Sequence, residues 1–192
     1  MRLGGHRLST LGDRQLKFLN EWAQDWRGAD LKCALSATIF CNLANYHGGN
    51  QAFIFADLDS NGWPQTGRNK AVDALRKCFA LSYAGDQHLP SIVHHGIDDF
   101  NDAGFSFCVP SIAAGYPRSW RPDVEGRPVQ NRPKPGLPNT GEYKGAFGHP
   151  LTVYAIGNPE KKNRPQGFQN RDRQVDSREI QLAKHGFRNA VG

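Results

Sequence analysis

Two carboxylates stand two residues apart in the stretch FIFADLDSNG, which covers residues 53–62. The apolar run before them predicts a short buried strand over residues 51–55, so Asp57 and Asp59 come at the end of that strand. Carboxylates at this spacing can hold Mg²⁺, and a bound Mg²⁺ can in turn bind a phosphate. The same residues also fit a strand that ends in a polar turn, where aspartate side chains accept hydrogen bonds from nearby backbone amides.

A second apolar run, over residues 90–95, ends in His94 and His95. A helix expected between the two runs predicts a right-handed crossover with parallel strands. The carboxyl ends of parallel strands open on one crevice, so His94 would lie near the two aspartates as an acid or base. One candidate function is therefore a metal-dependent phosphoryl- or nucleotidyl-transfer enzyme with Mg²⁺ as its cofactor. In a third arrangement, arginines rather than a metal lie between the two carboxylates.

The four cysteines, at positions 33, 41, 78 and 108, form no C-x-x-C pair and mostly have apolar neighbours. This predicts reduced, buried thiols, and the favoured interpretation includes no cofactor. No apolar stretch approaches the ~20 residues needed to cross a bilayer. The first ten residues also lack the apolar segment of a secretory signal. We therefore expect an intracellular protein, cytoplasmic or associated with a particle, without a membrane partner.

Charge is divided unevenly along the chain, whose formal net charge is +6. Residues 1–109 hold 10 Lys or Arg and 11 Asp or Glu, a net charge of −1, whereas residues 110–192 hold 14 and 7, a net charge of +7. A polyanion would therefore meet the C-terminal half. The basic residues expected to contact nucleic acid or neighbouring subunits are Arg118, Arg121, Arg127, Arg132, Lys134, Lys161, Lys162, Arg164, Arg171 and Arg173.

Hydrophobic periodicity predicts a compact α/β core over residues 1–109. We expect an amphipathic helix over residues 11–26 and an almost entirely apolar helix over residues 30–46, for which a buried strand over residues 36–43 is the alternative. A third helix is expected over residues 66–85. Strands are expected over residues 51–55, 90–95 and 104–109, with the first two parallel and the third antiparallel to the second.

From Pro110 the chain changes character, because most of its twelve prolines lie from this point onward. Proline fixes φ and disfavours helix in the residue before it, so residues 110–192 are expected to form an extended basic arm rather than a second domain. Periodicity in this arm is limited to a lone strand over residues 151–156 and a short helix over residues 177–184.

A small core with a long basic arm is typical of proteins whose arm gains order by wrapping a partner. We therefore expect a non-enzymatic structural subunit of a large assembly, such as a virion with its capsid or a ribonucleoprotein particle. Its partners would be other subunits, with its own copies among the candidates, and RNA or DNA bound through the phosphate backbone is a further candidate. The alternative is the metal-dependent transfer enzyme that uses Asp57, Asp59 and His94.

Overall fold

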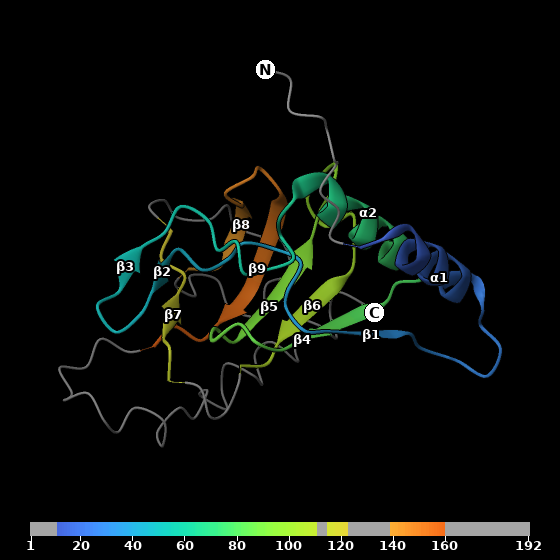
Figure 1. Ribbon diagram of the computed structural model, residues 1–192, viewed down its shortest axis with the longest axis horizontal. Helices are drawn as coiled ribbons and strands as arrows, with labels where there is room; N and C mark the ends of the chain where they lie inside the picture. Colours follow the sequence, from blue (N-terminus) through green and yellow to red (C-terminus); the bar gives the residue numbers. More distant parts are fainter. Residues whose placement is uncertain (1–10, 111–114, 123–138, 160–192) are drawn as a thin grey trace.

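The computed structural model describes residues 11–110, 115–122 and 139–159. It has the predicted α/β fold, with two helices, a six-stranded mixed sheet and a three-stranded sheet (Figure 1). The large sheet has the strand order β1-β4-β6-β5-β9-β8, and the small sheet has the order β3-β2-β7. The strands are β1 Cys33–Ser36, β2 Tyr46–His47, β3 Ala52–Phe53, β4 Leu81–Ala84, β5 Ser91–His95, β6 Phe105–Cys108, β7 Arg118–Ser119, β8 Gly141–Lys144 and β9 Pro150–Ile156.

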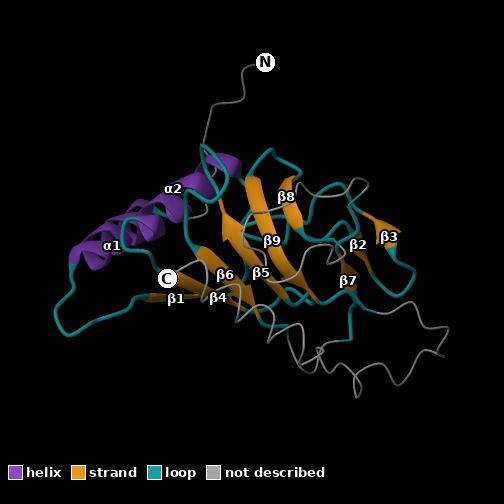
Figure 2. Ribbon diagram, turned by 180° about the vertical axis from the view of Figure 1, so that it is seen from behind, coloured by secondary structure: helices purple, strands orange, loops and turns teal. Residues whose placement is uncertain are grey.

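The two helices lie together at the end of the molecule away from the small sheet (Figure 2). α1 spans Asp13–Gln24 and α2 spans Gln65–Arg76, which confirms the helix predicted over residues 11–26 and the start of the helix predicted over residues 66–85. α2 ends earlier than predicted, because residues 81–84 form β4, a strand that periodicity did not reveal. The helices share a buried apolar cluster that contains Ala23, Phe40, Ala71, Val72, Leu75, Cys78 and Ala80.

Residues 30–46 do not form the predicted apolar helix. They contribute β1 and then an irregular segment over residues 39–44, whose side chains are all buried. The alternative strand over residues 36–43 is also wrong, since β1 lies almost wholly before that range. A short apolar run fits a buried helix and a buried extended segment equally well by periodicity. Here a side chain from elsewhere satisfies the backbone, as Arg68 Nε donates to the Phe40 carbonyl at 2.9 Å.

The strands predicted over residues 90–95 and 104–109 are confirmed as β5 and β6, and they pair antiparallel as expected. The strand predicted over residues 51–55 is wrong in extent and in place. Only β3 forms there, and it belongs to the small sheet, so it cannot pair parallel with β5. The parallel part of the large sheet consists of β1, β4 and β6.

Part of the predicted arm belongs to the two sheets. The strand predicted over residues 151–156 is present as β9, but it is not a lone strand, because it pairs with β5 on one side and β8 on the other. β7 pairs with β2 in the small sheet. The fully buried side chains of Leu151 and Val153 place β9 in the core. The helix predicted over residues 177–184 lies outside the described residues.

One arginine of α2 is fully buried. The Arg68 guanidinium donates to the carbonyl oxygens of Phe40 at 2.9 Å and Gly96 at 2.6 Å, and to His95 Nδ1 at 3.3 Å. Burial lowers the pKa of Arg68 to about 10, so the side chain stays charged at neutral pH. Because arginine only donates, His95 Nδ1 is an acceptor and the neutral ring carries its proton on Nε2. One side chain therefore ties α2 to the segment 39–44 and to the end of β5.

Replacing Arg68 by methionine should lower the free energy of unfolding by about 3–5 kcal/mol. Methionine fills much of the same space but leaves two carbonyl oxygens and one histidine nitrogen buried without a donor. Urea unfolding at neutral pH measures the loss, with Lys70→Met as a control at an exposed position of the same helix. Equal stability of the two variants would contradict this role for Arg68.

Mild acid should destabilise the fold through two buried histidines. Burial, reinforced by the Arg68 charge, lowers the pKa of His95 well below 6.5 and lowers the pKa of His149 to about 4. Below about pH 6.5 the unfolded chain binds a proton at each of the two histidines, whereas the folded protein keeps them neutral. The contribution of the two histidines to the free energy of unfolding is therefore complete above that pH and is lost as the pH falls. We expect a loss of about 1 kcal/mol per histidine between about pH 7.5 and about pH 5.5. Urea unfolding across this range measures it, and His149→Asn should flatten the dependence.

Candidate functional site

Asp57 and Asp59 lie in the loop that connects β3 to α2. The Asp59 N–H donates to Asp57 Oδ1 at 3.2 Å, and the Ser60 N–H donates to the Asp57 carbonyl oxygen at 3.3 Å. These bonds form the polar turn that the sequence allowed as one interpretation. Asp57 is buried whereas the Asp59 side chain is exposed, so the two carboxylates are not equivalent.

Arg118 of β7 lies between the two carboxylates. Its Nη1 is 2.6 Å from Asp57 Oδ2, and its Nη2 is 2.9 Å from Asp59 Oδ2. Nη1 also donates to Gln87 Oε1. An arginine of the basic half thus takes the position that the metal hypothesis gives to Mg²⁺. In the described part of the chain, no group of three or more His, Cys, Asp or Glu side chains is placed to hold a metal ion.

The bridge between Arg118 and Asp57 is internal. The Arg118 side chain is only 11% exposed, and Asp57 is buried beside it. Burial raises the pKa of Asp57, and the Arg118 charge opposes that shift. A buried carboxylate without a cation would be strongly destabilising, so the position of the loop depends on Arg118.

The buried segment 39–44 holds the loop from the inside. Asn42 Nδ2 donates to the Asp57 carbonyl oxygen and, at 3.1 Å, to Ser60 Oγ. Gly62 approaches Asn42 so closely that a Cβ atom at Gly62 would lie 2.2 Å from Asn42 Oδ1 and 2.6 Å from its backbone nitrogen. Any larger residue at Gly62 would therefore displace the loop.

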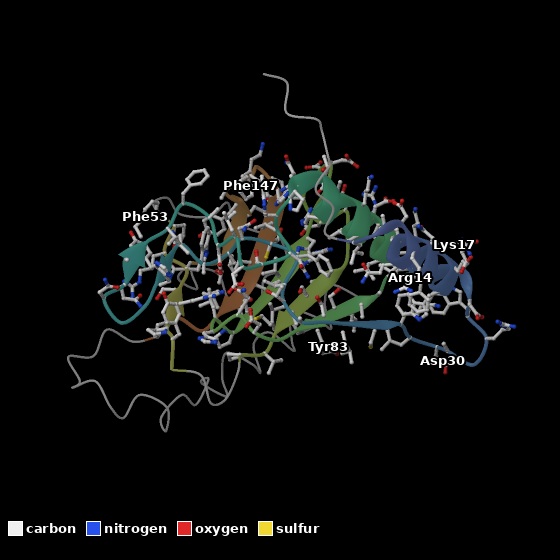
Figure 3. All side chains as sticks on the ribbon, viewed as in Figure 1. Arg14, Lys17, Asp30, Phe53, Tyr83 and Phe147 are labelled. Atoms are coloured by element: carbon white, nitrogen blue, oxygen red, sulfur yellow. The ribbon has the colours of Figure 1, made fainter. Side chains whose placement is uncertain are left out.

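The same loop, together with the last residue of β3, turns large apolar side chains outward. Phe53, Phe55, Leu58 and Trp63 are 62%, 71%, 60% and 41% exposed, and we call these four residues the loop surface. Phe147, between β8 and β9, lies beside them, with its ring centroid 5.0 Å from that of Trp63 and 6.4 Å from that of Phe55. Figure 3 shows Phe53 and Phe147 on the same part of the molecule.

The loop therefore reverses the usual distribution of polar and apolar groups. Single exposed apolar residues are common on proteins, but four exposed large apolar residues within eleven positions, two of them beside Phe147, form an informative patch when polar residues are buried beneath them. Such patches mark interaction sites in proteins that are otherwise well packed. The loop surface, on its frame of buried polar contacts, is the candidate functional site.

Sequence reasoning placed Phe53 and Phe55 in a buried strand and so missed the loop surface. An alternating pattern does not reveal which set of side chains faces inward. A usable signal was present farther along, where Leu58 and Trp63 stand among Asp, Ser, Asn and Gly residues that cannot continue a strand. Large apolar side chains in such a turn have no regular element through which to be buried.

The structure does not bring His94 to the aspartates. His94 lies near the C-terminal end of β5, where its Nε2 donates to the Ala103 carbonyl at 2.7 Å and its ring stacks on Phe105 at 4.0 Å. Gln87, which binds Arg118 beside the aspartates, lies before Ser91 at the other end of β5. Ser91 and His94 are about 10 Å apart along the strand. Burial lowers the pKa of His94. The predicted meeting fails because β3 is not a strand of the large sheet.

Two of the ten basic residues expected to contact partners lie within the described ranges. Arg118 forms the internal bridge, and Arg121 lies over the Tyr46 ring at 5.7 Å, with its N–H donating to Asn45 Oδ1 at 2.8 Å. The other eight, Arg127, Arg132, Lys134, Lys161, Lys162, Arg164, Arg171 and Arg173, lie outside the described residues.

Comparison of the chain with protein-family models, with curated proteins and with solved structures gives no match. Among the described helices, none is long and apolar enough to cross a membrane. Function is therefore inferred from the loop, its arginine bridge and its exposed surface.

Replacing Arg118 by methionine should lower the free energy of unfolding by about 3 kcal/mol, because Asp57 would stay buried without a cation. The matched variant Arg121→Met removes a cation that lies over the Tyr46 ring rather than beside a buried carboxylate, and it should cost less than about 1 kcal/mol. Adding Asp57→Asn to Arg118→Met should recover part of the loss, since it removes the unpaired charge. Urea unfolding of the four proteins measures these differences.

Two results would contradict this account of the bridge. One is an equal loss in the Arg118 and Arg121 variants. The other is a heat of Mg²⁺ binding to the wild type that disappears when Asp57 and Asp59 are both changed to asparagine, because the carboxylates cannot hold Arg118 and a metal ion in the same position.

Proposed function

We propose that this protein is a structural subunit of a larger assembly, such as a virion or a ribonucleoprotein particle, and that neighbouring subunits bind its loop surface. The observation that carries the proposal is the loop with four exposed large apolar residues held on buried polar contacts. Apolar area of this kind is removed from water in a protein contact, and that removal favours binding.

The size of the loop surface supports a protein partner. A fully exposed aromatic side chain presents about 200 Å², so the exposed fractions of these four residues amount to roughly 450 Å² of apolar area. A standard interface buries about 800 Å² on each partner, of which somewhat more than half is apolar. The loop surface therefore supplies about the apolar part of one such interface.

The rigidity of the loop also supports a binding role. Before any partner arrives, Arg118 binds the side chains of Asp57 and Asp59, and Asn42 binds the Asp57 carbonyl and packs closely on Gly62. A surface that is already in its bound shape loses less conformational entropy on association, which increases affinity. Large rings with few rotatable bonds add contact area at the same low entropic cost.

The basic residues support a second, separate contact with a polyanion. The described residues hold 11 Lys or Arg and 12 Asp or Glu, a net charge of −1, so the remaining 13 and 6 give the other segments a net charge of +7. Binding through dispersed arginines and lysines depends mainly on the phosphate backbone and weakens steeply with salt. Contacts through the loop surface are apolar and persist in salt.

The metal-dependent transfer enzyme is left without a specific observation in its favour. Both carboxylates that would hold Mg²⁺ bind Arg118, and His94 lies at the far end of β5. The assembly subunit uses the same two aspartates in a supporting role, since they position the loop that carries the exposed rings.

Changing Phe55 and Leu58 together to asparagine should weaken self-association about 100-fold, because each exposed apolar side chain buried in a contact contributes about 1.5 kcal/mol or more. Sedimentation of the full chain measures this, after nuclease treatment and in about 1 M salt, where charge contacts are screened. Phe18→Gln is the matched control, since Phe18 is a similarly exposed aromatic residue on α1. A wild-type protein that remains monomeric at every concentration, or an equal effect of the control, would contradict the proposal.

A further inference from the structure

A second apolar surface lies on β1 and β4. Their parallel register pairs Cys33 with Leu81 and Leu35 with Tyr83, so these four side chains share one face of the sheet. Ala34, between Cys33 and Leu35, packs against the helical cluster instead. The face that carries Leu35 and Tyr83 is therefore turned away from α1 and α2.

Leu31 and Phe79 lie two residues before Cys33 and Leu81, just outside the paired starts of β1 and β4. Leu35 is 84% exposed and Phe79 is 83% exposed, and Leu31 and Tyr83 are also exposed. We call Leu31, Leu35, Phe79 and Tyr83 the edge surface. With about 200 Å² for each fully exposed side chain, as for the loop surface, the exposed fractions of these four residues amount to roughly 500 Å² of apolar area.

Phe79 is held in solvent at a conformational cost. Its φ angle is 52°, in the left-handed region that bulky residues rarely adopt. The other non-glycine residues with positive φ among the described residues are Gln51, Asp86, Asn101 and Asn139, all of which are polar. Asparagine suits this conformation far better than phenylalanine, and the gain is of the order of 1 kcal/mol. The left-handed backbone ends α2, since the Phe79 N–H donates to the Arg76 carbonyl at 3.1 Å and the Ala80 N–H donates to the Leu75 carbonyl at 3.3 Å. This turn does not require an aromatic ring, so the exposed ring itself is left for a contact.

Both apolar surfaces adjoin a free strand edge. β1 is the last strand of the large sheet, and β3, which begins the loop surface, is the last strand of the small sheet. Within the described residues, no strand pairs with the outer side of either. A free edge presents unpaired N–H and C=O groups that can pair with a strand of another chain.

The two surfaces lie at different ends of the long axis of the molecule. In Figure 1 β3 is at the left end and β1 is toward the right, and Figure 2 shows the same separation from behind. One molecule therefore cannot bring its own two surfaces together. A second copy can bring its loop surface to the edge surface of the first.

We propose that copies of this chain associate head to tail, with the loop surface of one copy packed on the edge surface of the next. This inference rests on the proposed function and names its partner as a second copy. The two areas, roughly 450 and 500 Å², match each other and together provide about the apolar share of a standard interface of about 1,600 Å². Contact between two different patches repeats, so it generates a ring or a filament rather than a closed dimer.

Complementation between two variants tests the proposal. The loop variant is Phe55→Asn with Leu58→Asn, and the edge variant is Leu35→Thr with Phe79→Asn, which suits the strand and the left-handed backbone. Each variant alone should be monomeric in sedimentation of the full, nuclease-treated chain. An equal mixture should form a heterodimer and nothing larger, because each variant supplies one intact surface and the pair then has none left.

The outcomes separate this inference from the proposed function. If the edge variant assembles like the wild type, the edge surface has another role, such as contact with residues 160–192 of its own chain, and the inference is overturned. If the edge variant forms dimers alone and the mixture adds none, the loop surfaces bind each other and the inference is also overturned, while the proposed function stands. A monomeric wild type would overturn both. Phe18→Gln, mixed with either variant, should act as the wild type does.

Discussion

The guanidinium of Arg118, which is only 11% exposed, joins β7 to the loop after β3 and to the segment before β5. It binds Asp57 and Asp59 in the loop after β3, and it binds Gln87 just before β5. β3 itself pairs through only two residues, so strand pairing alone holds the loop weakly. Because Arg118 belongs to β7, these bonds attach the small sheet to the segment before β5. Charge pairing therefore acts together with apolar packing where the two sheets meet, since Trp120, directly after β7, packs on Tyr143 of β8.

Polar groups fill the interior beneath this loop, so its aromatic rings cannot be buried there. Asp57, Ser60 and Gly62 take the inward positions of the loop, and each makes a contact that an aromatic side chain could not make. The loop of eleven residues between β3 and α2 has few inward positions, so filling them with polar groups forces Phe55 and Leu58 outward. The cost of exposing apolar area is then offset only when a partner covers it. On the proposed function, folding and binding are therefore linked through the same short stretch.

The sequence predicted the elements whose periodicity reflects their burial. α1, α2, β5, β6 and β9 have one apolar face or a short apolar run, and each was placed near its true position. The predictions from the sequence failed where contacts between distant parts of the chain determine the local structure. The segment 39–44 is apolar enough for a helix, but it is irregular and its Phe40 carbonyl accepts a hydrogen bond from Arg68. The run Phe53 to Phe55 resembles a buried strand, because composition does not show that the interior beside this loop is occupied by Arg118. The arginine between two carboxylates could be considered from charge, but only the fold could select Arg118.

On the proposed function, the division of charge links assembly to a polyanion. The described residues have a net charge of −1, so two copies brought together through apolar surfaces repel each other little. The remaining segments carry a net charge of +7 per copy, and that repulsion grows with every copy added. Salt screens it only partly at physiological ionic strength, where the Debye length is about 8 Å. A nucleic acid that neutralises the basic segments would remove the repulsion and release counterions, so the same apolar contacts would hold the copies together at a lower protein concentration once the polyanion is bound.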